Sequence, residues 1–451
     1  MRSHCLSAQQ IGLNSVHFRD GIIAFMSLIG RSFLHASDLH LGFPLGELKD
    51  CDQLSDENLT FIVKEMQGAF DNLIQVAIDN NVLFVVLAGD IYDNLDSQDA
   101  LQADFRNGLL KLEEHGIGAY IIHGNHDPLL KGYKPRRELP ATVKVFGTAE
   151  PHEFIAAQTD EGMVSVAGIS FGSNAVTENL TVGFRNLPHE NAKWRVGVLH
   201  TSMSGNSAHD TYAPCSVEDL RTAPVGYWAL GHIHLRNDSN SLGDGRWWAY
   251  SGNLQGRNFK PAECHPKGAL LVTLNRNGFD APQFIACDTV RFQNIQIDVS
   301  EINEFDDCSR LLIKEVIKAS NSLENRRLVM RVELIGRSFF HKEIRTQVEN
   351  GKMRTDFLGD FASELGSTIV AGITSTVKPT YDLNELRQAQ GLIGTTLRIL
   401  DQMSDEEVLT ESKKLVVAAA SECIGDDDAV AIRERTAMAL VEAILEGNKK
   451  S

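Results

Sequence analysis

The chain has 451 residues, of which 43% are hydrophobic and 23% are charged, a composition that excludes wholesale disorder, collagen-like repeats and a small disulfide scaffold. At about 150 residues per domain, this length predicts roughly three domains. The formal net charge of −17 argues against a broad basic surface for nucleic acid, although bound metals can supply positive charge at a phosphate site. No segment reaches the ~20 apolar residues that span a bilayer, so we expect no membrane association.

The seven cysteines are scattered and form no Cys-x-x-Cys motif, which favours free thiols in a reducing compartment and predicts a cytoplasmic protein. Residues 1–30 are interpreted as a leader from a misassigned start, with Met26 as the expected first residue. A secretory signal is disfavoured, because cleavage near Ala36 would remove the first core strand.

The first part of the chain alternates between strand and helix patterns. Strands are expected at residues 32–37, 82–88 and 117–122, with helices at 58–79 and 97–115 between them. This order predicts parallel strands with helices outside the sheet. Further strands are expected at 143–146, 164–169, 195–199, 227–230, 247–250 and 269–274, with a helix at 176–184. We therefore predict an α/β fold in which two sheets form a sandwich over residues 31–287.

The pattern changes after residue 287. Residues 288–380 are expected to form a small α+β capping module, and residues 381–451 a helical segment. In the module, strands are expected at 293–299 and 328–335, and helices at 305–319 and 342–349. In the helical segment, helices are expected at 383–402, 405–423 and 427–446.

Acidic, imidazole and amide side chains follow five of the expected strands at the point where each strand ends. The segments are Asp38-Leu39-His40, Gly89-Asp90-Ile91-Tyr92-Asp93, Gly124-Asn125-His126-Asp127, His200 and Gly231-His232-Ile233-His234. The carboxyl ends of strands in an open α/β sheet are where ligands bind. Each segment alone is also typical of a turn, a helix cap or a core histidine, but the five together predict one site.

Imidazole and carboxylate groups suit divalent transition metals, and seven such ligands fit two ions that share a carboxylate. Two ions about 3.5–4 Å apart clamp the attacking and leaving oxygens of a displacement at phosphorus. The motif set resembles the calcineurin-like metallophosphoesterases over about residues 31–275. Within that superfamily it is similar to the SbcD-type DNA-repair exonucleases, and most similar to their YhaO-like group. The segments that carry this similarity are residues 35–42, 88–93, 123–129, 209–216 and 250–257.

The resemblance implies two metal sites joined by Asp90. One set of ligands would be Asp38, His40, Asp90 and His234, and the other Asp90, Asn125, His200 and His232. It further implies a hydroxide that bridges the ions and attacks the phosphodiester, with His126 protonating the leaving oxygen. Asp93, which stands where some of the nuclease branch have histidine, would orient the ring of His126. Manganese is the implied metal, while the ligand chemistry alone also admits iron, zinc or nickel.

Two further residues are candidates for substrate binding. Arg257 has a planar guanidinium that suits a phosphate, and a surface ion pair is an equal alternative. His209 lies between two predicted ligand segments, where an ordinary solvated loop is nearly as well supported.

The resemblance implies a DNA exonuclease that works in DNA repair with an SMC-like coiled-coil ATPase of the SbcC/YhaN kind. Residues 383–446 would dock that partner, or else cap their own domain. Members of the branch are often homodimers. Two alternatives stay open: a phosphodiesterase for small nucleotides, and a regulatory scaffold subunit of an ATPase complex.

Overall fold

The computed structural model describes most of the chain in two compact units. The described residues are 31–42, 54–93, 99–130, 137–187, 192–203, 212–237, 240–321, 323, 326–360, 365–366, 368–408 and 429–449. The first unit holds the described residues up to 295 together with 314–332 and 358–373, and the second holds 296–313, 333–357 and those from 374 onward. The predicted leader lies outside the described residues, and the boundaries predicted at 287 and 380 stay predictions.

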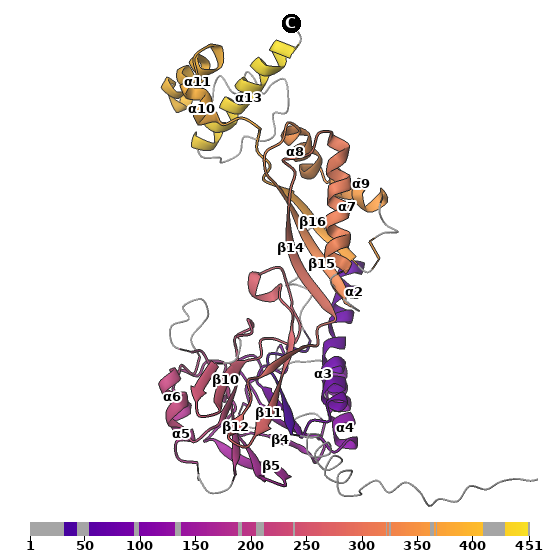
Figure 1. Ribbon diagram of the computed structural model, residues 1–451, viewed down its shortest axis with the longest axis vertical. Coiled ribbons are helices and arrows are strands. Elements are labelled where there is room, and N and C mark those ends of the chain that lie inside the picture. The colour runs from indigo at the N-terminus through magenta and orange to yellow at the C-terminus, as the bar shows by residue number, and fades with distance from the viewer. Residues whose placement is uncertain are drawn as a thin grey trace, which may run out of the picture. The chain divides into compact units, whose positions relative to one another are not determined.

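The first sheet has parallel strands at its centre, as the sequence predicts. Its strands follow the order β12-β11-β1-β2-β3-β4, with β13 also paired to β11. Their bounds are β1 Ser32–Ala36, β2 Phe84–Ala88, β3 Gly118–Ile122, β4 Val143–Val145, β11 Gly268–Asn275, β12 Gly278–Phe279 and β13 Gln283–Ala286. Strands β1 to β4 are parallel, whereas β11 runs antiparallel to β1. Helices α3 (Gly68–Asp79) and α4 (Asp99–Glu114) cover the outer face through one apolar cluster (Figure 1).

A second sheet packs against the inner face of the first and completes the predicted sandwich. Its order is β5-β6-β7-β8-β10-β9, with bounds β5 His152–Thr159, β6 Gly162–Gly168, β7 Trp194–His200, β8 Tyr227–Gly231, β9 Asn240–Gly243 and β10 Arg246–Tyr250. The buried aromatic rings of Phe33, Phe84 and Tyr227 belong to the cluster between the two sheets. Helices α5 (Thr181–Phe184) and α6 (Val217–Thr222) share an apolar cluster with the strands of the second sheet.

Several element predictions in this region are wrong in detail. The helix predicted at 58–79 is two helices, α2 (Asp56–Met66) and α3, that meet at Gln67. The helix predicted at 176–184 begins only at Thr181. Strands β5 and β9 were not predicted, because these segments are only partly buried and lack a clean alternation of apolar side chains.

The remaining elements form a three-stranded sheet and a helical cluster. The sheet has the order β14-β15-β16, from β14 (Val290–Asp298), β15 (Arg327–Ile335) and β16 (Thr368–Ser375), with helices α7 (Phe305–Asn321), α8 (His341–Glu349) and α9 (Lys352–Asp360). The predicted α+β module is therefore present, although β16 and α9 were not expected from the sequence.

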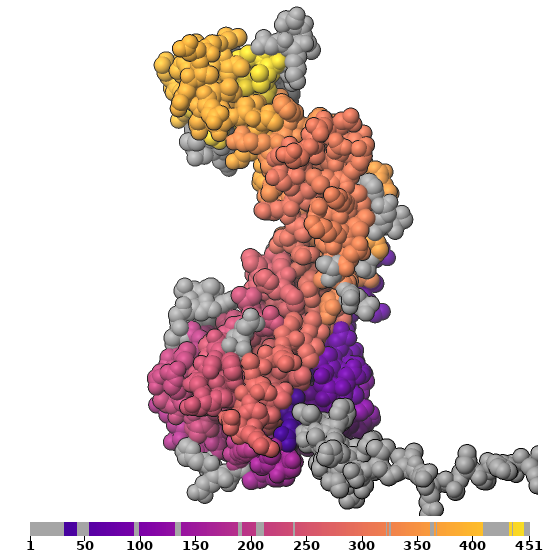
Figure 2. All heavy atoms as spheres, in the orientation of Figure 1, coloured from indigo at the N-terminus to yellow at the C-terminus, as the bar shows by residue number. Residues whose placement is uncertain are grey.

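The C-terminal helices share a small apolar core within the second unit. Helices α10 (Leu383–Gln388), α11 (Leu392–Gln402) and α13 (Ala429–Lys449) meet around Leu397, Leu400 and Val441. These helices are coloured orange to yellow in Figure 2. The single helix predicted at 383–402 is interrupted at Gly391, where φ is 110°. Most of the helix predicted at 405–423 lies outside the described residues. In the described part of the chain, no helix is long and apolar enough to cross a membrane.

Candidate metal centre

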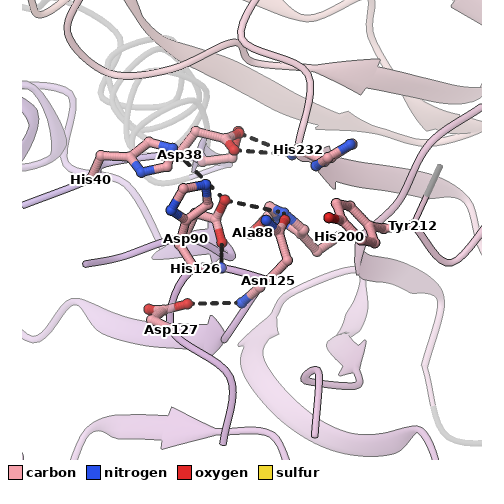
Figure 3. Close-up of polar contacts among 12 residues, drawn as sticks. Asp38, His40, Ala88, Asp90, Asn125, His126, Asp127, His200, Tyr212 and His232 are labelled. Carbon is pink, nitrogen blue, oxygen red and sulfur yellow. Dashed lines mark hydrogen bonds and ion pairs between the residues drawn. The ribbon is translucent and has the colours of Figure 1, made fainter. Parts of the chain in front are cut away.

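The predicted ligands meet at one edge of the sandwich, where strands of both sheets end (Figure 3). Asp38 and His40 follow β1, and Asp90 follows β2. Asn125 and His126 come from the loop after β3, His200 is the last residue of β7, and His232 and His234 follow β8. Each side chain arrives at the site because its strand ends there, so the topology of the two sheets assembles the cluster.

The backbone is strained where these side chains are presented. Of the seven described non-glycine residues with a positive φ angle, four are predicted ligands: Asp38 (52°), His40 (46°), Asp90 (50°) and His232 (98°). Such conformations cost about 1–3 kcal/mol at a non-glycine residue and concentrate at functional sites. The surrounding hydrogen bonds hold the strained loops, since Asp38 N–H and His40 N–H donate to the carbonyls of Gly89 and Asp90 over 3.0 Å each.

Three of the histidines face an oxygen with Nδ1, which leaves Nε2 for a metal. His200 Nδ1 lies 3.0 Å from the carbonyl oxygen of Ala88, and His234 Nδ1 lies 2.8 Å from a carboxylate oxygen of Glu263. His40 Nδ1 lies 3.1 Å from Asp93 Oδ1, without the geometry of a hydrogen bond. An oxygen partner at Nδ1 fixes the tautomer of a ligating histidine and raises its basicity.

The free ends of these side chains converge. His40 Nε2 and His234 Nε2 are 3.1 Å apart, and Asp90 Oδ2 lies 3.7 Å from His40 Nε2 and 3.4 Å from His200 Nε2. Two nitrogens that bind one cation at about 2.0–2.1 Å lie about 3 Å apart when they subtend a right angle at it. Converging lone pairs and carboxylates repel each other without a cation, so the donor set fits divalent metal ions.

The clusters overlap the two predicted ligand sets only in part. Close groups of possible ligand atoms are formed by Asp38, His40 and His234, by Asp38, Asp90 and His200, and by His40, Asp90 and His126. Asn125 Oδ1 lies 3.0 Å from His200 Nε2. The backbone N–H of His232 donates to both oxygens of Asp38 at 3.1 Å, and its ring centroid lies 5.3 Å from that of His200.

The charge states of His40, Asp90 and His200 depend on one another. Burial disfavours the charged ring of His200, but the carboxylate of Asp90 outweighs this effect and raises the pKa of His200 to about 9. Burial likewise disfavours the charged form of Asp90, yet His200 and His40 hold the pKa of that carboxyl far below its usual range. Burial, helped by the charge of Arg257, lowers the pKa of His40. With this raised pKa, we expect His200 to be protonated and positively charged in the metal-free protein at neutral pH.

Metal binding is accordingly expected to release a proton and to weaken as the pH falls. Below its pKa of about 9, His200 must lose its proton before Nε2 can bind a metal, so the apparent affinity falls up to about tenfold per pH unit. Calorimetric titration with Mn²⁺ in buffers of different ionisation enthalpy measures the released proton. An affinity that stays constant between about pH 6.5 and 8.5 would contradict this expectation.

The loops that carry the ligands are tied together by Asp127. Its carboxylate accepts hydrogen bonds from the backbone N–H groups of Gly124, Ile91 and Tyr92 at 2.9–3.3 Å, and it lies 3.0 Å from His123 Nδ1. Asp127 is 1% exposed. The last residue of the Gly-Asn-His-Asp motif thus holds the Asp90 loop against the loop of Asn125.

Replacing Gly124 by alanine is expected to lower metal affinity by at least about tenfold, in the range typical for disturbed supports of metal ligands. An added Cβ would lie 2.3 Å from Asp90 Oδ1 and 2.8 Å from His200 Nε2, so both ligands must move. Gly147→Ala is the matched control, because its Cβ would meet nothing within 4 Å. Equal Mn²⁺ affinities for the two variants would show that the site tolerates this displacement.

Asp93 holds His126 differently from the sequence-based expectation. The Nδ1 atom of His126 lies 3.0 Å from the backbone carbonyl oxygen of Asp93. The Asp93 carboxylate instead accepts a 2.9 Å hydrogen bond from Arg257 Nη1 and lies beside His40 Nδ1. A backbone carbonyl is available whatever side chain residue 93 carries, so the arrangement at His126 does not depend on a carboxylate there.

The structure describes only one of the two residues predicted to bind substrate. Arg257 lies at the edge of the cluster in an ion pair with Asp93, and because both side chains are largely buried this is not the surface ion pair of the alternative interpretation. His209 lies outside the described residues. Glu263, which contacts His234, was not found by sequence reasoning, because it belongs to no motif and lies 29 positions further along the chain.

Comparison with known proteins agrees with this geometry. Residues 31–236 match the family model described as calcineurin-like phosphoesterase. The uncharacterized metallophosphoesterase YhaO of Bacillus subtilis is 32% identical over 270 residues, which are 60% of this chain and 64% of that protein. The DNA double-strand break repair protein Mre11 of Sulfurisphaera tokodaii is 27% identical over 271 residues, 59% of this chain and 62% of its own. Mre11 of Sulfolobus acidocaldarius is 23% identical over 368 residues, 78% of this chain and 88% of its own.

The match thus spans less than two thirds of the length of the first two of these relatives. The family model covers strands β1 to β8 and all five ligand-bearing strand ends, whereas β9 to β13 lie beyond it. Residues 31–236 are therefore similar to the calcineurin-like phosphoesterases, and the ligand-bearing strand ends of the candidate centre all lie within this region.

Proposed function

We propose that this protein is a two-metal-dependent phosphodiesterase that acts on DNA as an exonuclease. The observation that carries the proposal is the convergence on His40 Nε2, which lies 3.1 Å from His234 Nε2 and 3.7 Å from the carboxylate of Asp90. Two divalent ions, when bound, would polarise a phosphate and lower the pKa of a water molecule. A divalent cation bound by both ring nitrogens would account for their close approach.

The metal ligands are assigned as the sequence predicts, with Asp90 shared. One set is Asp38, His40, Asp90 and His234, and the other is Asp90, Asn125, His200 and His232. Manganese is proposed as the metal, and mixed nitrogen and oxygen ligands of this kind also accept iron, zinc or nickel.

His126 and Arg257 are proposed to act on the substrate. His126 is exposed at the open side of the cluster, and its ring centroid lies 4.7 Å from that of His40. With Nδ1 held at the Asp93 carbonyl, Nε2 is the atom that can give a proton to a leaving oxygen. Arg257, neutralised by Asp93 in the absence of substrate, would exchange that carboxylate for a phosphate oxygen.

DNA is proposed as the substrate because two of the relatives are named DNA double-strand break repair proteins. An SMC-like coiled-coil ATPase is proposed as the partner, docked through the C-terminal helices. Leu392 and Ile399 on α11 are 68% and 56% exposed. They are seven residues apart and therefore share one helix face, which supports a docking role for this segment.

Labelled linear duplex DNA tests the proposal. Metal-free protein is supplied with Mn²⁺, Mg²⁺ or Zn²⁺, and the length of the DNA is followed with time. Stepwise shortening with Mn²⁺ is the expected result. Hydrolysis of a small phosphodiester without cleavage of any DNA would replace the DNA substrate by a small nucleotide, and no hydrolysis of either would favour the scaffold alternative.

A further inference from the structure

Glu263 lies directly behind the candidate metal centre and is 5% exposed. It ends the short 3₁₀ helix η2 (Pro261–Glu263), in a segment that folds back over the strand-end loops. One carboxylate oxygen lies 2.8 Å from His234 Nδ1. The other accepts hydrogen bonds from Asn253 Nδ2 at 2.8 Å and from the backbone N–H of Arg257 at 3.1 Å.

The three partners of the Glu263 carboxylate, His234 Nδ1, Asn253 Nδ2 and the Arg257 backbone N–H, can each donate a hydrogen bond to it. The Arg257 backbone is always a donor, and an ionised carboxylate accepts at both oxygens. His234 Nδ1 therefore carries the proton, and His234 Nε2 keeps its lone pair on the side that faces His40 Nε2 at 3.1 Å. The carboxylate thus selects the tautomer of His234 that can bind a metal.

Lys267 holds the backbone of His234. The ammonium group of Lys267 donates to the backbone carbonyls of His234 and Ala262 at 2.6 Å each. Lys267 is 2% exposed, and its charge offsets that of Glu263 in the same buried region. The ring and the backbone of His234 are therefore both fixed by the segment from Asn253 to Lys267.

We propose that Glu263 is a positioning residue that holds His234 in its metal-binding tautomer and, through the same carboxylate, fixes the backbone of Arg257. The proposal rests on the metal centre of the proposed function. Since the Arg257 side chain pairs with Asp93, whose carbonyl holds His126, Glu263 also joins the metal ligands to the groups that would face the substrate.

Glutamine cannot replace this carboxylate without loss. If its amide oxygen faces Asn253 and Arg257, its NH₂ group faces His234 Nδ1, which favours the tautomer with the proton on Nε2. If its oxygen faces His234, the NH₂ group opposes the backbone N–H of Arg257, which cannot change its role. One pose blocks the metal ligand and the other displaces Arg257.

Titration of metal-free protein with Mn²⁺ tests this role without any DNA. Glu263→Gln is expected to weaken one of two binding events about 10- to 100-fold, the usual effect of removing such a partner. Glu218→Gln is the control, because Glu218 is an exposed glutamate on α6. The His234→Ala variant measures how much affinity is lost when the ligand itself is removed. A Glu263→Gln affinity within twofold of wild type, while His234→Ala loses a site, would overturn the proposal.

A spectroscopic readout separates tautomer selection from general support of the fold. In long-range ¹H–¹⁵N spectra of the metal-free wild type, we expect the His234 proton on Nδ1, assigned by comparison with His234→Ala. A proton on Nε2 would overturn the proposal even if Glu263→Gln does not fold. If wild type binds two ions but leaves DNA intact, the DNA substrate fails and the role of Glu263 stands; if wild type binds no metal, both fail.

Discussion

Replacing Asp90 by asparagine is expected to reduce phosphodiester hydrolysis by about 10³-fold or more, since two-metal catalysis contributes several kcal/mol and each 1.4 kcal/mol is a factor of ten. Asp90 Oδ2 is near both His40 Nε2 and His200 Nε2, and Oδ1 accepts from the backbone N–H of His126 at 3.0 Å. Asparagine removes the only charge that both ligand sets share. The NH₂ group of asparagine would also face either the backbone N–H of His126, which is itself a donor, or the ring nitrogens of His40 and His200, where a cation would bind.

The control for this variant is Asp71→Asn on α3, where the carboxylate is exposed and pairs with Lys111. Initial rates with a chromogenic phosphodiester and Mn²⁺ measure the loss, and the metal content of each variant is measured alongside. An Asp90→Asn enzyme that keeps more than about a tenth of the wild-type rate, a loss of less than 1.4 kcal/mol, would show that Asp90 is not shared by two ions.

His126→Ala is expected to lower kcat by about 10²–10⁴-fold, the usual contribution of a positioned general acid, while Mn²⁺ affinity changes less than twofold. The reason is that alanine keeps the backbone N–H that donates to Asp90 and removes only the ring. The loss is expected to be larger for DNA, whose leaving oxygen needs a proton, than for a nitrophenyl ester, whose leaving group does not.

His115→Ala is the matched control, because this exposed histidine follows α4 and its ring contacts the backbone carbonyl of Lys111, away from the site. Rates with both substrates and Mn²⁺ titrations distinguish the two possible roles of His126. Equal losses with the two leaving groups, together with weakened metal binding, would make His126 a ligand instead of a proton donor, as its closeness to His40 and Asp90 also allows.

The ligand cluster could be predicted from the sequence because each member is attached to the end of a buried strand. Continuous apolar runs mark strands such as β2 and β3, and parallel order brings their carboxyl ends to one edge. The motifs therefore need no long-range information beyond the sheet itself. Strand β5 was missed for the opposite reason, since its apolar residues follow no regular period.

The partners that hold the ligands could not be predicted. Glu263 contacts His234 only because a loop and a 3₁₀ turn fold back over the site. The ion pair between Asp93 and Arg257 joins residues 164 positions apart, and neither lies in a periodic pattern that indicates which way its side chain points. The sequence predicts which side chains could bind a metal, whereas the tertiary fold decides which atoms hold them in place.

Binding of Mn²⁺ to the metal-free protein, followed by electron paramagnetic resonance, tests the two-metal centre most directly. We expect two ions per chain and a spin-coupled spectrum, because ions about 3.5–4 Å apart interact magnetically. The Asp90→Asn variant is expected to lose the coupled signal. A single uncoupled ion in the wild type, or no bound ion, would contradict the two-metal centre and with it the proposed chemistry.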